Sequence, residues 1–186
     1  MIPTLTTERL TLRPWRDADR GPVAAITADP EVMRFFARSR DRAQSDAWLA
    51  RVHNHFERTG FGIFAVDAHD LHGTPLIGFV GLSTVPDTIP SAPAVEAVWT
   101  LGRAFWRRGY ALEAATAAIR DGFSRIGLPE IVAFTAVINT PSRGVMEKLG
   151  MQRDPADDFD HPAVPEGNPV RPHVVYRLPR PASAEA

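Results

Sequence analysis

One basic turn decides the fold of this chain: Phe105-Trp106-Arg107-Arg108-Gly109-Tyr110-Ala111. The apolar run before it, residues 94–101, predicts a strand, and the alanine-rich run from Leu112 predicts a helix. The first N–H groups of a helix have no partner within it and carry the positive end of its dipole, and a glycine lets the backbone approach an anion closely. The turn therefore predicts a diphosphate site. The alternative is an ordinary strand-to-helix connection on which Arg107 and Arg108 are a solvated surface pair.

A second motif follows about thirty residues later: Asn139-Thr140-Pro141-Ser142-Arg143-Gly144-Val145-Met146-Glu147-Lys148-Leu149-Gly150. Together the two motifs resemble the GCN5-related N-acetyltransferase (GNAT) superfamily, and more closely its RimJ/RimL-type branch. The opening Thr7-Glu8-Arg9-Leu10-Thr11-Leu12-Arg13-Pro14-Trp15 looks like that branch's first strand, and Asp29-Pro30-Glu31-Val32-Met33-Arg34-Phe35 like its first helical hairpin. The resemblance spans about residues 6–178. It implies an N-acetyltransferase that uses acetyl-CoA as co-substrate and a primary amine as acceptor.

Composition limits the classes of protein that this chain can represent. We expect one domain over residues 1–186, with a core at about 6–178 and a flexible tail at 179–186. A net charge of −1 argues against nucleic-acid binding, and the absence of cysteine excludes disulfides, thiolate metal sites and a cysteine nucleophile. We see no signal peptide and no apolar run near the ~20 residues that span a bilayer, so we expect a cytoplasmic protein without membrane contact.

The hydrophobic pattern predicts a mixed α/β sheet flanked by helices, in the order β-α-α-β-β-β-α-β-α-β-β, which is the GNAT-type fold that the resemblance implies. Asp17 is expected to cap a first helix, and Ser39 or Asp41 to open a second that Gly60 ends. A turn at 68–74 carries Asp70 and Gly73. The expected strands are 9–15, 61–67, 75–85, 95–101, 130–138 and 174–178, and the later helices are 111–126 and 141–149.

The resemblance places the pyrophosphate of acetyl-CoA on the backbone of the basic turn. The expected cofactor-binding residues are Trp99, Leu101, Arg107, Arg108, Gly109, Tyr110, Ala111, Asn139 and Ser142. Family members often carry Gln or Arg three residues before the glycine, where this chain has Trp106. Binding through backbone N–H groups tolerates that difference.

Glu96 is the candidate general base, because it is the one carboxylate in the apolar strand Val95-Glu96-Ala97-Val98-Trp99. If its side chain faces a cleft, desolvation raises its pKa and makes it a better base, directly or through a water. If it faces solvent, it is an exposed edge residue. RimJ/RimL-like sequences carry a matching glutamate.

Asn139 and Ser142 are candidates for binding the pantetheine arm, and Ser142 also for protonating the leaving thiolate. Both residue types are equally common as helix caps. Many family members place a tyrosine acid three or four residues after this serine, where this chain has Val145 and Met146. Ser142, a water or Tyr176 would then serve, or the thiolate leaves unassisted.

Asp160, His161 and His173 belong to a polar segment that resembles a loop of some RimJ/RimL-like enzymes, and they are our candidates for lining the acceptor site, where carboxylates would attract a cationic amine. A purely structural surface loop is the alternative. Asp and two separated histidines do not establish a metal site, and we expect no metal.

Two rival functions remain open: a non-catalytic CoA-binding module on the same fold, and a nucleotide-binding protein that uses the turn for another phosphate. The second lacks a further glycine-rich loop and an Asp placed to hold Mg²⁺. Three classes of acceptor stay open, namely a protein N-terminus, a polyamine-like amine and an amino sugar, and the protein is expected to be a monomer or a homodimer.

Overall fold

The computed structural model describes residues 2–71 and 76–182, and their strands form one mixed sheet in the order β1-β2-β3-β4-β5-β6-β9-β7, with β8 also paired to β9. Every pairing is antiparallel except that between β5 and β6. The strands are β1 (Leu5–Thr6), β2 (Leu10–Arg13), β3 (Ile63–Ala68), β4 (Gly78–Thr84), β5 (Val95–Leu101), β6 (Glu130–Ala136), β7 (Gln152–Arg153), β8 (Phe159–Asp160) and β9 (Pro172–Pro179). The mixed α/β class is thus confirmed.

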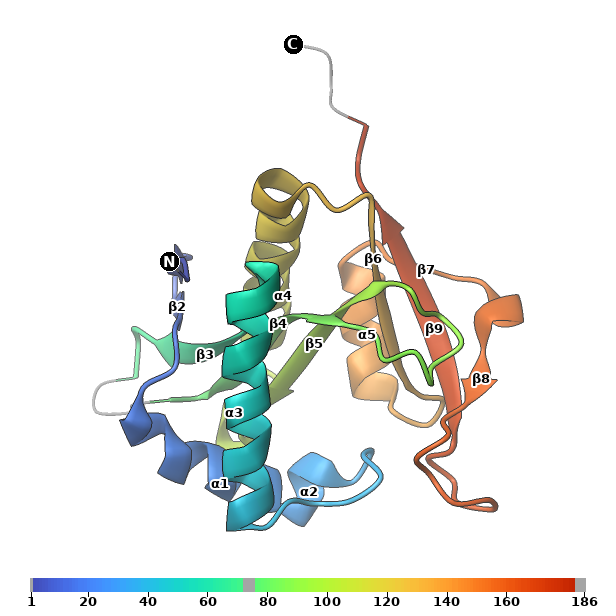
Figure 1. Cartoon of the computed structure of the whole chain (residues 1–186), viewed down its shortest axis with the longest axis horizontal. Helices are drawn as coiled ribbons and strands as arrows, with labels where there is room; N and C mark the ends of the chain where they lie inside the picture. Colours follow the sequence, from blue (N-terminus) through green and yellow to red (C-terminus); the bar gives the residue numbers. More distant parts are fainter. Residues whose placement is uncertain (1, 72–75, 183–186) are drawn as a thin grey trace.

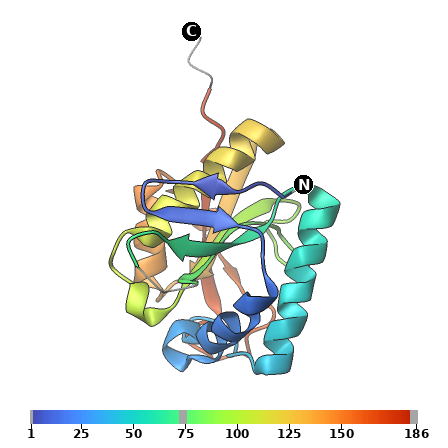
Figure 2. The same cartoon turned by 90° about the vertical axis from the view of Figure 1, so that its left-hand side faces the viewer.

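Helices cover both faces of the sheet (Figures 1 and 2). One face carries α1 (Arg20–Ala28), α2 (Pro30–Met33) and α3 (Arg42–Thr59), and the other α4 (Tyr110–Asp121) and α5 (Thr140–Lys148). None of the helices within residues 2–71 and 76–182 has the length and apolarity needed to cross a membrane.

Alternating side chains on the central strands build a core on each face. On β3, Ile63 and Ala65 pack with the α1–α3 cluster, while Phe64 and Val66 pack against α4. Both sets are buried, so β3 is apolar at every position from Ile63 to Val66 and shows no hydrophobic–polar alternation. The same alternation on β5 sends Val98 to the α1–α3 face and Ala97 and Trp99 to the α4 face.

Most predicted helix ends are confirmed, and the differences have local causes. Asp41 caps α3 in a capping box, and Gly60 closes it at φ 76°. Asp17 does not cap α1, because a 3-10 turn (Asp17–Asp19) comes first and the Asp19 carboxylate accepts from the Arg16 N–H at 2.7 Å. The helix predicted at 111–126 is α4 followed by one π-helical turn (Gly122–Ile126).

The observed boundaries of strands and turns differ more from the predicted ones than the helix ends do. The first strand is shorter than 9–15, because after β2 the chain turns toward α1 and the Trp15 indole N–H donates to the Ile63 carbonyl at 2.7 Å. β4 begins at Gly78, and Gly73 and the predicted start of that strand at residue 75 lie outside the described residues.

The C-terminal region is more ordered than its composition predicts. Two valines of the polar segment, Val164 and Val170, are 3% and 7% exposed and pack with Ala136, because these isolated apolar residues turn inward between the turns. β9 runs through Pro179, and the Arg180 N–H donates to the Pro129 carbonyl at 2.8 Å, so the expected tail does not begin at residue 179. Residues 183–186 lie outside the described part.

Candidate active site

The sheet divides between β5 and β6. These parallel strands are in register at Glu96 and Val132, and β5 then continues to Leu101 and β6 to Ala136 without a further registered pair. Figure 1 shows the two strands running apart from this point. Their separation leaves polar backbone edges that no strand covers.

A cavity of about 1720 Å³ occupies this division and reaches both faces of the sheet. It brings together most of the residues that the sequence singled out: Glu96, Trp99, Leu101, Arg107, Gly109, Tyr110, Ala111, Asn139, Ser142, His161 and His173. Two candidates do not line it. Arg108 lies on the outer side of the basic turn, and the exposed Asp160 pairs with Arg171 at 3.2 Å. Asp160 is therefore not placed to contact an acceptor in this cavity.

The basic turn has the backbone geometry of an anion site. Arg107 and Gly109 have positive φ angles of 60° and 82°, and α4 begins immediately afterwards at Tyr110. No described side chain caps the start of α4, whereas Asp41 caps α3 and Asn139 caps α5. Its first N–H groups and its dipole therefore face the mouth of the cavity without an internal anion.

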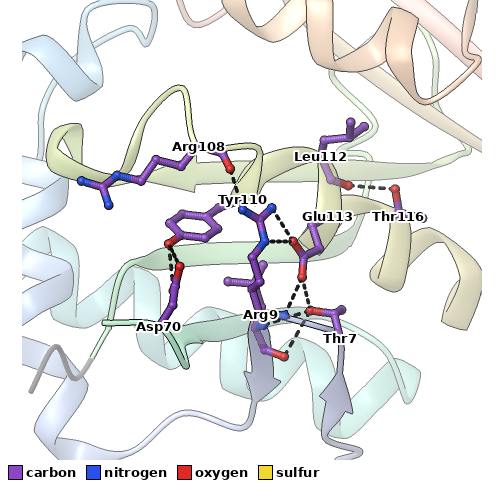
Figure 3. Close-up of polar contacts among 9 residues, drawn as sticks. Thr7, Arg9, Asp70, Arg108, Tyr110, Leu112, Glu113 and Thr116 are labelled. Atoms are coloured by element: carbon purple, nitrogen blue, oxygen red, sulfur yellow. Dashed lines mark hydrogen bonds and ion pairs between the residues drawn. The ribbon is translucent and has the colours of Figure 1, made fainter. Parts of the chain in front are cut away.

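A clamp formed by Arg9, Glu113 and Thr7 holds this turn (Figure 3). The Arg9 guanidinium bonds the Glu113 carboxylate through Nε at 2.7 Å and Nη2 at 2.6 Å, and Nη1 donates to the Arg108 carbonyl at 2.9 Å. The Thr7 hydroxyl donates to the same carboxylate at 2.6 Å. Although burial works against ionisation, these hydrogen bonds keep the pKa of Glu113 below its ordinary value.

The clamp fixes the direction of one peptide group. In a trans peptide the carbonyl and the following N–H point to opposite sides. Because the Arg108 carbonyl is bound by Arg9, the Gly109 N–H points away from Arg9, which itself does not line the cavity. The pairing also neutralises a carboxylate in the first turn of α4, where a bound phosphate would otherwise meet a like charge. Sequence reasoning missed this role, because Arg9 and Glu113 are 104 positions apart and nothing in the sequence couples them.

Glu96 lies on the cavity wall at the point where the strands divide. It shares the α1–α3 face of β5 with Val98, and no described residue donates a hydrogen bond or a positive charge to its carboxyl group. Burial raises the pKa of Glu96 to about 8. The carboxyl group is thus poised to exchange a proton near neutral pH.

The two candidate residues after β6, Asn139 and Ser142, differ in whether their side-chain polar atoms already have hydrogen-bond partners. Asn139 caps α5, since its Oδ1 accepts from the Ser142 N–H at 3.4 Å and its Nδ2 donates to the Thr135 hydroxyl at 2.8 Å. The half-buried Ser142 hydroxyl has no partner among the described residues and faces the cavity. Tyr176 is 4% exposed, donates to Glu147 at 3.1 Å and is absent from the cavity wall, so it is not placed as the acid.

His161 and His173 form part of an aromatic wall with Phe134 and Phe159. The ring centroids of His161 and His173 are 4.8 Å apart, and the ring centroid of Phe134 lies 6.3 Å from that of His173. His173 is a β9 residue, and not a loop residue as the sequence suggested, and its Nδ1 donates to the Arg171 carbonyl at 3.0 Å. Burial lowers the pKa of both histidines, which favours their neutral forms. No group of three or more potential metal ligands occurs within residues 2–71 and 76–182.

Residues 9–152 match the family model of the acetyltransferase (GNAT) domain. The chain belongs to this family. It is accordingly an acetyl-CoA-dependent N-acetyltransferase, and the uncapped start of α4 beside a left-handed glycine fits the diphosphate of acetyl-CoA.

Two relatives align with most of this chain. The chain is 30% identical over 148 residues to an uncharacterised Bacillus subtilis protein, YkkB. The alignment covers 79% of this chain and 84% of YkkB. It is 32% identical over 158 residues to the FsC-acetyl coenzyme A-N(2)-transacetylase of Aspergillus fumigatus, covering 80% of this chain and 65% of that longer protein.

Solved structures share the fold. An acetyltransferase from Agrobacterium tumefaciens has a TM-score of 0.77 at 29% identity, with 96% of this chain and 95% of that chain covered. RimL, a ribosomal alpha-N-protein acetyltransferase solved in complex with coenzyme A, has a TM-score of 0.76 at 10% identity, with 95% and 98% covered. The second likeness concerns the fold alone.

Replacing the clamp arginine, Arg9→Gln, is expected to raise the KM for acetyl-CoA about tenfold while kcat at saturation stays unchanged, because the turn loses its fixed peptide orientation. Arg125→Gln is a matched control at the far end of α4, since Arg125 pairs with Asp121 at 2.6 Å and donates to the Gly60 carbonyl at 2.9 Å. The control should lose similar thermal stability yet keep its KM. Equal KM values in both variants would contradict the role of the clamp.

The stability of the folded protein should also report the state of Glu96. The pKa of Glu96 is about 8 in the folded protein against 4.5 in an unperturbed chain. Between these two pH values the Glu96 carboxyl group is therefore mostly protonated in the folded state and ionised in the unfolded state. The stability of the wild type relative to Glu96→Gln is therefore expected to fall as pH rises from about 4.5 to about 8, and to level off outside that window. Thermal unfolding across this range measures it, with the exposed Glu57→Gln as control. A pH-independent difference would show that the Glu96 carboxyl is not desolvated.

Proposed function

We propose that this N-acetyltransferase moves the acetyl group of acetyl-CoA to a primary amine by direct attack in a ternary complex. The observation that carries the proposal is Glu96, a carboxyl group without a partner among the residues that the structure describes, facing the same cavity as the uncapped start of α4. In this proposal the donor phosphates and the base occupy two walls of one cavity.

Each step has a candidate group. The backbone N–H groups of Gly109, Tyr110 and Ala111 bind the diphosphate, with the exposed Arg107 adding charge. Ionised Glu96 accepts a proton from the acceptor ammonium, directly or through a water. The amine nitrogen then bonds to the thioester carbonyl carbon and the carbon–sulfur bond breaks. As the amide forms, the nitrogen gives up its second proton, which passes to the thiolate through the Ser142 hydroxyl or a water, or goes to solvent if the thiolate leaves unprotonated.

The acceptor in this proposal is a protein N-terminus or a small-molecule amine. The motif resemblance supports the RimJ/RimL-type branch, and the name of the fungal relative specifies transfer to a nitrogen. The His161 and His173 rings, whose lowered pKa favours the neutral form, would with Phe134 give the acceptor an aromatic wall in the same cavity as Glu96. The rival, a non-catalytic CoA-binding module, does not account for an unpartnered carboxyl group on the cavity wall.

Gly109→Glu tests the donor site, because it places a negative charge in the turn. We expect the affinity for acetyl-CoA, measured by calorimetric titration, to fall at least about a hundredfold, while the wild type binds acetyl-CoA and CoA far more tightly than ATP. Gly127→Glu is the matched control: its φ of 79° imposes the same backbone strain at the other end of α4. Undiminished affinity in Gly109→Glu, or equal affinity of the wild type for ATP, would overturn the donor site.

Glu96→Gln tests the base. We expect kcat with an amine acceptor to fall about a hundredfold, which is within the usual range for a general base, with KM for acetyl-CoA unchanged. The loss should be greatest below the pKa of the acceptor ammonium, where a base is required. Wild-type kcat at every pH would remove Glu96 as base and favour the binding-module alternative.

A further inference from the structure

The cavity extends beyond the reacting centre along the α1–α3 face of the sheet, where it ends at Arg40 and Trp48. Arg40 precedes the cap of α3, and its guanidinium lies 5.1 Å from the Trp48 ring centroid. Trp48 in turn packs against Phe79 at 4.6 Å and edge-on to Trp15 at 5.9 Å. The aromatic platform restricts the guanidinium to a few orientations.

Arg40 is the exception among the sheltered arginines. Of the described arginines that are buried or half-buried, Arg9, Arg13, Arg143, Arg171 and Arg177 each donate to a carboxylate, carbonyl or hydroxyl oxygen. The Arg40 guanidinium donates to no described residue. Burial, together with the like charges of Arg51 and Arg38, lowers its pKa. A sheltered, uncompensated guanidinium on a cavity wall is a site for an anion, and its planar fork matches a carboxylate.

The other cavity arginines differ. Arg34 is paired with Glu31 at 2.9 Å, and Arg103 and Arg107 are exposed to solvent. An anion entering from this side would therefore meet Arg40 as its unpaired and sheltered partner.

Strand geometry relates this site to the base. Thr100 lies four residues after Glu96 on the same face of β5 and pairs with Phe79, the ring on which Trp48 rests. At about 3.3 Å per residue, Thr100, and with it the Phe79 ring that supports Trp48 and Arg40, lies roughly 13 Å along the strand from Glu96. A molecule with its amine at Glu96 and its anionic group at Arg40 must be elongated.

We infer that Arg40 is a carboxylate-binding subsite of the acceptor site, and that the acceptor is an elongated primary amine with a carboxylate remote from the amine, such as a short peptide. The inference rests on the proposed function and narrows its acceptor. It assigns the Arg40 guanidinium to the acceptor and not to acetyl-CoA, because Trp48, on which Arg40 stacks, packs on the α1–α3 face, whereas α4 packs on the opposite face and only Trp106 of its turn contacts both clusters.

The test compares acceptors that differ only in charge at the far end. Straight-chain ω-amino acids and di- to tetrapeptides are assayed with acetyl-CoA, each as the free carboxylate and as the carboxamide. The wild type should favour the carboxylate about tenfold in kcat/KM at the best spacing. Arg40→Gln should bring this ratio to about one, and Arg40→Lys, which keeps the charge without the fork, should lie between. The exposed Arg38→Gln, which removes a charge two residues away and off the cavity wall, should keep the wild-type ratio.

The remaining outcomes are separable. A wild type that acetylates both members of every pair equally, or an Arg40→Gln variant that keeps the preference, overturns the subsite and leaves the proposed function standing. A raised KM for acetyl-CoA in Arg40→Gln assigns Arg40 to the donor and overturns the subsite as well. Binding of acetyl-CoA without acetylation of any acceptor overturns the proposed function together with this inference. Should Arg40→Gln fail to fold, Arg40→Lys against Arg38→Gln decides.

Discussion

The parallel pairing of β5 and β6 is the constraint on which the rest of the structure depends. Parallel neighbours cannot be joined by a tight turn, so the chain must cross over the sheet, and here α4 makes that crossing. A crossover helix begins where its strand ends. The free end of α4 therefore lies at the carboxyl ends of the two strands, where they separate. The anion site, the cavity and the exposed strand edges all follow from one change of strand direction.

Polar groups divide into those that hold the scaffold and those that face the cavity. Arg13 forms ion pairs with Asp19 and Asp67, and Arg177 forms ion pairs with Asp157 and Glu130, so each guanidinium is neutralised by carboxylates. The Glu96 carboxyl and the Ser142 hydroxyl, by contrast, have no described partner. A folded protein tolerates few sheltered polar groups in this state. Their gathering in one cavity favours roles with a bound molecule over roles in packing.

Local sequence signals predicted the fold class and most helix ends, because caps and left-handed glycines act within a few residues, as Asp41 and Gly60 do. They also selected the two strand-to-helix junctions that meet at the cavity. They failed where distant parts decide the outcome. Val164 and Val170 are buried by a strand that their own segment does not contain. The sequence carries no signal for the roles of Arg9 and Arg40. Only the fold places Arg9 against Glu113 and leaves Arg40 without a counter-charge among the described residues.

The clamp also couples ligand binding to the edge of the sheet. Arg9 stands immediately before β2, so the contacts that orient the phosphate turn are the same contacts that hold β1 and β2 against α4. Thermodynamic linkage makes such coupling reciprocal. If docking of the N-terminal hairpin increases the affinity for acetyl-CoA by some free energy, bound acetyl-CoA stabilises the docked hairpin by the same free energy. The co-substrate thus acts as a ligand of the folded N-terminus, and the docked hairpin is protected against local opening whenever the enzyme is loaded.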